Sequence, residues 1–131
     1  MGENTPQERN INVAIEMQMR DKKSLTLVDT IIEYHEALEY YTPEGMKRRL
    51  ERAGYVVEPL SDGSFAGIAF EDGGGYKIVF GGDGIFQYHP AYRSHHGGEY
   101  WKTQKQGIGE WYDRKGKLIK RKVNGKEVSI D

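Results

Sequence analysis

Hydrophobic and polar residues follow two different periods along this chain of 131 residues. In the first part, apolar side chains recur every three or four residues, as in Val28, Ile31, Ile32 and Leu38, which is typical of an amphipathic helix. After Gly54, short runs with strand-type alternation are separated by turn residues, and twelve of the seventeen glycines fall between residues 63 and 109. The pattern therefore predicts helices first and strands afterwards.

Local signals place the ends of these elements. Thr5-Pro6-Gln7-Glu8 and Thr42-Pro43-Glu44 are helix starts with proline at the first helical position, and Gly54 suits a helix C-terminus. Asn124-Gly125 is a strong hairpin signal. We expect mostly helix over about residues 5–53, then a glycine-rich sheet over about 55–130, with strands near 55–59, 65–70, 76–80, 85–89, 99–104, 109–113, 117–123 and 126–130.

The connections between the expected strands are too short for crossover helices, so the sheet should be mainly antiparallel. Helices followed by an antiparallel sheet define the α+β class. We see no linker or internal repeat and expect a single domain over residues 1–131. A helix longer than two turns anywhere in 76–130 would contradict this interpretation.

Composition narrows the function classes. The absence of cysteine excludes disulfides, thiolate zinc sites and thiol catalysis. No apolar run approaches the roughly 20 residues of a membrane span. The polar start MGENTPQERN is unlike a signal peptide. We therefore expect a soluble, cytoplasmic protein that does not associate with a membrane.

Charge is unevenly distributed, although the net charge is only −1. Residues 93–131 carry ten Lys/Arg against five Asp/Glu, and the run RKGKLIKRK (114–122) has six basic residues in nine. Such a run favours either a patch that faces phosphates or the solvated face of an edge hairpin.

The stretch QYHPAYRSHHGGEYWK (87–102) concentrates the candidate chemistry. Histidine suits both proton-transfer roles of RNA cleavage without a metal. His89, His95 and His96 are the candidate catalytic residues. Arg93 and Lys102 are candidates for binding phosphate, and Tyr88, Tyr100 and Trp101 for stacking a base.

Two other interpretations of this stretch stay open. His89, His95 and His96 with Asp83 or Glu99 have the ligand types of a metal site. Adjacent histidines on extended backbone project in different directions, however, and we predict neither a metal nor a cofactor. A small sheet with these residue types can also bind a nucleotide or a partner protein without catalysis. His35 lies on the apolar stripe of its helix, where we expect it to be packed and hydrogen-bonded.

The sequence phrases YTPEGMKRRLERAGYVVEPL, FEDGGGYKIVF, GGDGIFQYHP, HHGGEYWK and WYDRKGKLI span about residues 41–120. They resemble short C-terminal modules of phage and mobile-element proteins and of polymorphic toxins. Their general sequence character is similar to that of the barnase–EndoU–colicin–RelE-like ribonuclease group. The resemblance implies a metal-independent endoribonuclease. It would make His89 or the His95-His96 pair the proton-transfer groups, and Arg93 and Lys102 the phosphate binders.

Two functions follow as hypotheses. The first is a small phage or mobile-element protein that resembles a ribonuclease toxin, with RNA as its substrate. The alternative is a non-enzymatic binder that sequesters a nucleotide-like ligand or inhibits a host defence or immunity protein. The two are distinguished by whether proton-transfer groups and a cation converge on one point.

Overall fold

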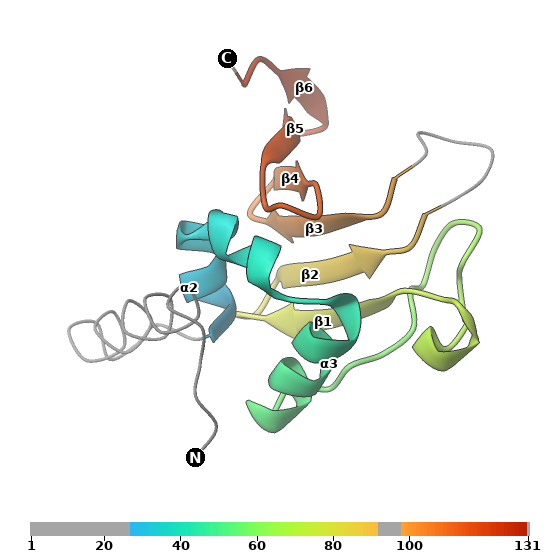
Figure 1. The fold of residues 1–131 in the computed structure, drawn as a ribbon. Coiled ribbons are helices and arrows are strands. Elements are labelled where there is room, and N and C mark those ends of the chain that lie inside the picture. The colour runs from blue at the N-terminus through green and yellow to red at the C-terminus, as the bar shows by residue number, and fades with distance from the viewer. Residues whose placement is uncertain (1–26, 92–97, 131) are drawn as a thin grey trace.

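The computed structural model of the chain describes residues 27–91 and 98–130. The first elements in this part are the helices α2 (Leu27–Glu33), η1 (His35–Tyr40, 3₁₀) and α3 (Pro43–Arg52). A short 3₁₀ helix, η2 (Phe70–Asp72), then precedes the strands β1 (Tyr76–Phe80), β2 (Gly84–His89), β3 (Tyr100–Lys105), β4 (Ile108–Tyr112), β5 (Leu118–Val123) and β6 (Lys126–Val128). Helices followed by strands confirm the predicted α+β class (Figure 1).

The strands of the described residues form one six-stranded antiparallel sheet in sequence order. Each strand pairs with the next one in the chain, so the sheet is a meander built from local hairpins. Asn124 and Gly125 turn the last hairpin with φ of 50° and 83°, as a type I′ turn requires. The described residues from 76 onward contain no helix, which agrees with the strand-type alternation.

Four aromatic side chains lie directly opposite one another across β1 to β4 and form what we call the aromatic row: Tyr76, Tyr88, Trp101 and Tyr112. Each is at most 5% exposed. The ring centroids of Tyr76 and Tyr88 are 5.5 Å apart, and those of Tyr88 and Trp101 are 5.2 Å apart. Directly opposed aromatic side chains stabilise a strand pair, so this row specifies the register of the sheet.

The helices cover the sheet face that carries the aromatic row. Leu27, Val28, Ile31, Leu38, Met46 and Leu50 form one core with the row and with Ile78, Phe80 and Phe86. Thr42 caps α3 by accepting a hydrogen bond of 2.9 Å from the Gly45 N–H, and Gly54 follows the helix with φ of 97°. The predicted start and end of this helix are confirmed. No helix within residues 27–91 and 98–130 is long and apolar enough to cross a membrane.

The sheet begins later than the sequence predicts. In the segment 55–59, Glu58 makes only an isolated bridge to Lys77, and Pro59, which has no N–H to donate, follows it. The segment 65–70 turns at Gly67, which has φ of 75°, and it leads into η2 instead of forming a strand. Glycine and proline thus override the β-type residues before Tyr76. The expected helix over 5–26 lies outside the described residues.

Arg114, in the turn between β4 and β5, joins distant parts of the chain. Its Nε donates a hydrogen bond of 2.8 Å to Glu99, and its Nη1 donates one of 2.9 Å to the carbonyl of Tyr41. The guanidinium also lies 5.7 Å from the ring centroid of Trp101. Glu99 accepts a second hydrogen bond from the hydroxyl of Tyr88. These contacts tie β2, β3 and the β4–β5 turn to the segment before α3.

His35 makes a second tie to the same turn. Its Nδ1 donates a hydrogen bond of 2.5 Å to the carbonyl of Gly116, and its ring stacks on Tyr112 with a centroid distance of 4.8 Å. A Cβ on Gly116 would lie 2.2 Å from the His35 carbonyl oxygen, so only glycine allows this approach. The prediction of a packed, hydrogen-bonded His35 is confirmed.

We expect Arg114→Met to lower the free energy of unfolding by about 1–3 kcal/mol, because Glu99 then keeps a half-buried charge without its cation. Urea denaturation measures the change. The matched control is Arg48→Met, which removes an exposed ion pair with Glu44 one helical turn away and should cost less than about 1 kcal/mol. Equal losses of unfolding free energy in the two variants would show that Arg114 stabilises the fold no more than an exposed ion pair does.

Candidate functional site

The face of the sheet opposite the helices carries a straight line of polar side chains. Strand alternation turns Lys77, Gln87, Lys102, Trp111 and Lys120 to this side, and each pairs directly with the next across β1 to β5. We call this line the outer row. It runs beside the aromatic row but on the other face, because Lys77, Gln87, Lys102 and Trp111 each neighbour a buried position in the chain, and Lys120 pairs with Trp111.

Trp111 lies along its own strand. A Cβ added at Gly109 would be 3.2 Å from Cη2 and Cζ3 of Trp111, so the indole occupies the space over this glycine. A larger residue at 109 would push the ring away from the sheet. The absence of a side chain at Gly109 thus leaves room for the Trp111 ring to pack against the outer face of the sheet.

Three ammonium groups gather at this ring. The Nζ atoms of Lys102, Lys120 and Lys122 lie 4.7, 4.9 and 6.0 Å from the ring centroid of Trp111. We call these residues the lysine cluster. None of them forms an ion pair with a carboxylate of the described residues. The aromatic face attracts the cations and holds them close together.

The three ammonium groups of the lysine cluster repel one another. Burial lowers the pKa of Lys102, and the charges of Lys122 and Lys120 lower it further, whereas Asp62 opposes the shift. Like charges that are held close together are stabilised by an anion that binds between them. The cluster therefore has the electrostatics of an anion site.

His89 and Tyr100 stand beside the outer row at the end of β2 and the start of β3. Their rings stack with a centroid distance of 4.6 Å and an angle of 10°. His89 Nε2 donates a hydrogen bond of 2.8 Å to Gln87 Oε1, which makes Nδ1 the basic nitrogen of the neutral ring. Burial raises the pKa of Tyr100.

The charge state of His89 follows from its surroundings. Burial and then the nearby charge of Lys102 lower the pKa of His89 from 6.5 to about 4. The imidazole is therefore neutral at neutral pH and can accept a proton but carries no charge for a phosphate. Any anion on this face must be held by the lysines.

The sequence-predicted residues fall into three groups. His89, Tyr100 and Lys102 lie together on the outer face. Tyr88 and Trp101 belong to the aromatic row and are 5% and 0% exposed, so they face the core and not the outer surface. Arg93, His95 and His96 lie outside the described residues.

The prediction of individual residues missed Trp111, Lys120, Lys122, Gln87 and Lys77 as parts of one surface. The basic run 114–122 contained the signal for two of them, and the structure places Lys120 and Lys122 beside an aromatic ring. Their meeting with Lys102 depends on two strand pairings, which no local motif encodes.

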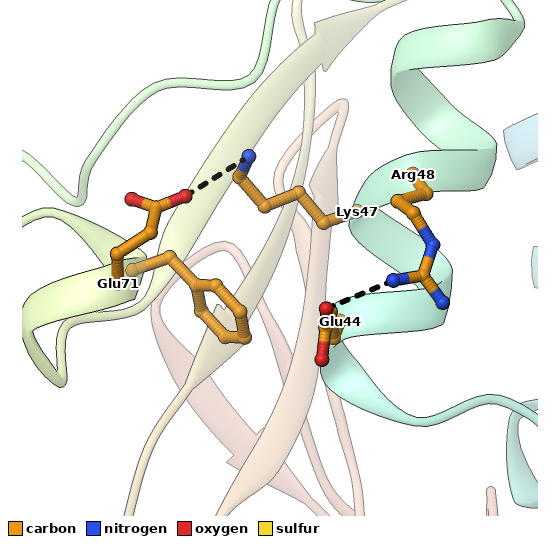
Figure 2. A pocket seen from close by; sticks show the side chains of 5 residues that line it. Glu44, Lys47, Arg48 and Glu71 are labelled. Atoms are coloured by element: carbon orange, nitrogen blue, oxygen red, sulfur yellow. Dashed lines mark hydrogen bonds and ion pairs between the residues drawn. The ribbon is translucent and has the colours of Figure 1, made fainter.

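A separate hollow of about 370 Å³ lies between α3 and η2 and is lined by Glu44, Lys47, Arg48, Phe70 and Glu71. Figure 2 shows that its charges are paired within it: Lys47 with Glu71 at 3.4 Å, and Arg48 with Glu44 at 2.8 Å. A site whose charges already satisfy one another attracts an ionic ligand less than the lysine cluster does. We therefore place the candidate site on the outer face.

Within residues 27–91 and 98–130, no three side chains of the His, Asp and Glu types are grouped so that they could hold a metal ion. Comparison of the chain with protein-family models, curated proteins and solved structures finds no match.

We expect the protein to lose stability on acidification through His89. Its pKa is lowered in the folded state, so the stabilisation by the neutral ring is complete above pH 6.5 and is lost as the pH falls from 6.5 towards 4. His89→Phe keeps a ring over Tyr100 but cannot titrate. The difference in melting temperature between wild type and variant, measured across this range, should change with pH. A difference that stays constant would contradict the lowered pKa.

Proposed function

We propose that this protein binds a phosphate-bearing ligand, a nucleotide or a nucleic acid, on the outer face of its sheet. The observation that carries the proposal is the convergence on the ring of Trp111 of three ammonium groups that form no ion pair within residues 27–91 and 98–130. Lysine is a common phosphate binder, and aromatic rings among cations are typical of surfaces that bind nucleic acids.

The position of the cluster supports this function over a merely solvated face. Exposed lysines that only protect a sheet edge are expected on the edge strand. Here Lys102 lies on the inner strand β3 and is half-buried, whereas Lys115, Lys117 and Lys126 are exposed. Desolvating a cation among other cations is unfavourable unless an anion joins them.

A second candidate, metal-independent RNA cleavage, is favoured by the position of His89. A neutral histidine beside Gln87 and close enough to Lys102 to feel its charge is suited to accept a proton from a 2′-hydroxyl while the lysine holds the phosphate. RNA cleavage requires two proton-transfer groups, a base and an acid. Among the described residues, the outer face has one histidine, so the ribonuclease hypothesis requires a second group that these residues do not supply. Binding is therefore the function that the geometry supports best.

The binding proposal predicts that replacing Lys102, Lys120 and Lys122 together by Gln lowers the affinity for a mixed-sequence RNA. The slope of log affinity against log salt should fall by about 2, because roughly 0.7 counterions are released for each contact with a single strand. The readout is fluorescence of Trp111, one of two tryptophans, the other being the buried Trp101, together with a labelled RNA.

The matched control replaces Lys115, Lys117 and Lys126 by Gln. It changes the net charge of the protein by the same amount and leaves the outer face intact. Equal loss of affinity in the two triple variants would reduce the effect to overall charge and would contradict a specific site.

The cleavage hypothesis predicts that wild-type protein cleaves RNA in the presence of a chelator and that His89→Phe lowers the rate by roughly 100- to 10,000-fold with RNA affinity retained. Because the pKa of His89 in the free protein is about 4, kcat/KM, which reports the ionisation of the free enzyme, should stay constant from pH 6 to 8 and fall only near pH 4. If the wild type does not cleave RNA at any pH, the enzyme is excluded and the binder remains.

A further inference from the structure

The outer row extends well beyond the lysine cluster. From Lys77 on β1 to Lys120 on β5 it crosses four strand-to-strand intervals, roughly 19 Å at about 4.8 Å each. A single phosphate group needs only the cluster at one end of this distance. The remaining length of the row therefore bears on the size of the ligand.

The composition of the row suits a chain that lies across the strands. Its two ends are cationic, with Lys120 at one end and Lys77 at the other. Between them lie Gln87, whose amide can donate hydrogen bonds, and Lys102. Glu58 forms an isolated β-bridge with Lys77, so a negatively charged residue lies just beyond this end of the outer row.

Aromatic rings occur along this path at two places. Trp111 lies over Gly109, and Tyr100 stacks on His89 next to Gln87 and Lys102. Rings that lie on the surface of a sheet stack unpaired bases, whereas the bases of a duplex are already stacked on each other. Cations spaced along a line that also carries rings match a single strand better than a duplex or a compact polyphosphate.

We propose that the ligand is a single-stranded nucleic acid that crosses the sheet along the outer row, with its phosphates on the lysine cluster and Lys77 and a base on Trp111. This inference rests on the proposed phosphate-binding function and adds the class of ligand and its path. The ammonium groups over Trp111 move from the ring to the phosphates when a base stacks there, which flexible lysine side chains allow.

The test measures the affinity of the full chain for oligonucleotides of about two to ten nucleotides, for a duplex of the longest one and for tripolyphosphate. Affinity should rise with length until the oligonucleotide spans the row, at about four to six nucleotides, and then level off. Lys77→Gln should weaken the longer oligonucleotides several-fold, with a salt slope lower by about 0.7, and should leave the shortest unchanged. The matched control is Lys126→Gln, which lies off the row.

Trp111 is tested separately because it also holds the lysines. Trp111→Leu should lower the affinity for base-bearing oligonucleotides about fivefold or more, and should lower the affinity for abasic oligonucleotides of the same length much less. A residue that only positions the lysines would weaken both kinds equally. The ratio of the two affinities therefore distinguishes stacking from positioning.

The outcomes separate this inference from the proposed function. If tripolyphosphate and every oligonucleotide bind equally well and Lys77→Gln has no effect, the ligand is compact and the path across the row is wrong, while phosphate binding stands. A duplex that binds as tightly as the single strand overturns the single-strand inference alone. If none of these ligands binds, both proposals fail.

Discussion

The cross-strand pairing of the aromatic row is the interaction on which the remaining structure depends. Tyr76, Tyr88, Trp101 and Tyr112 face one another on consecutive strands, and Phe86 stacks on Trp101 with a centroid distance of 5.6 Å. Strand side chains alternate between the two faces, so a slip of one residue would expose these rings and bury the lysines. The register that buries the aromatic row is the same register that aligns the outer row. Stability and the candidate site therefore have one structural cause.

The outer face holds interactions that folding alone does not favour. Lys102 is half-buried among like charges, and His89 is desolvated enough for its pKa to fall to about 4. Each costs stability relative to a neutral, solvated side chain, and the packed core on the other face offsets that cost. Arg114 shows the contrasting case, because its charge is matched by Glu99 and by the carbonyl of Tyr41. Arg114 thus has partners for its half-buried charge, whereas Lys102 lies among other cations, and this difference is what supports the proposed binding of an anion on the outer face.

Sequence reasoning predicted the parts of the fold that depend on neighbouring residues. The start of α3 at Thr42-Pro43 and the Asn124-Gly125 turn each follow from a few adjacent residues and their backbone preferences. The segments 55–59 and 65–70 are predicted as strands because their side chains are β-type, whereas Pro59 in the first and Gly67 in the second prevent a continuous ladder. The strand propensity of individual side chains therefore gives a wrong prediction where a glycine or proline sets the backbone conformation.

The candidate site was predicted only in part, for a different physical reason. A β-bulge between Trp111 and Tyr112 shifts the β4–β5 register, so that Leu118 pairs with Tyr112 while Ile119 stays 48% exposed. The adjacent apolar residues Leu118 and Ile119 do not indicate which of them faces the core. Without the bulge position, the faces of Lys120 and Lys122 cannot be assigned. Tyr88 and Trp101 were assigned to ligand binding because the loop suggested chemistry, although strand alternation places them in the core.

The electrostatic effect of Lys102 on His89 relates the proposed binding to proton chemistry. Burial is the first cause of the low pKa of His89, and the charge of Lys102 is the second. In the complex that we propose, a phosphate on Lys102 would offset that charge and so raise the pKa of His89 above its value in the free protein. By linkage, protonation of His89 strengthens phosphate binding by the same factor. In the free protein, burial and the charge of Lys102 together keep the imidazole neutral. If the proposed phosphate ligand binds to Lys102, it also stabilises the protonated ring and brings the pKa of His89 closer to the value that proton transfer at neutral pH requires.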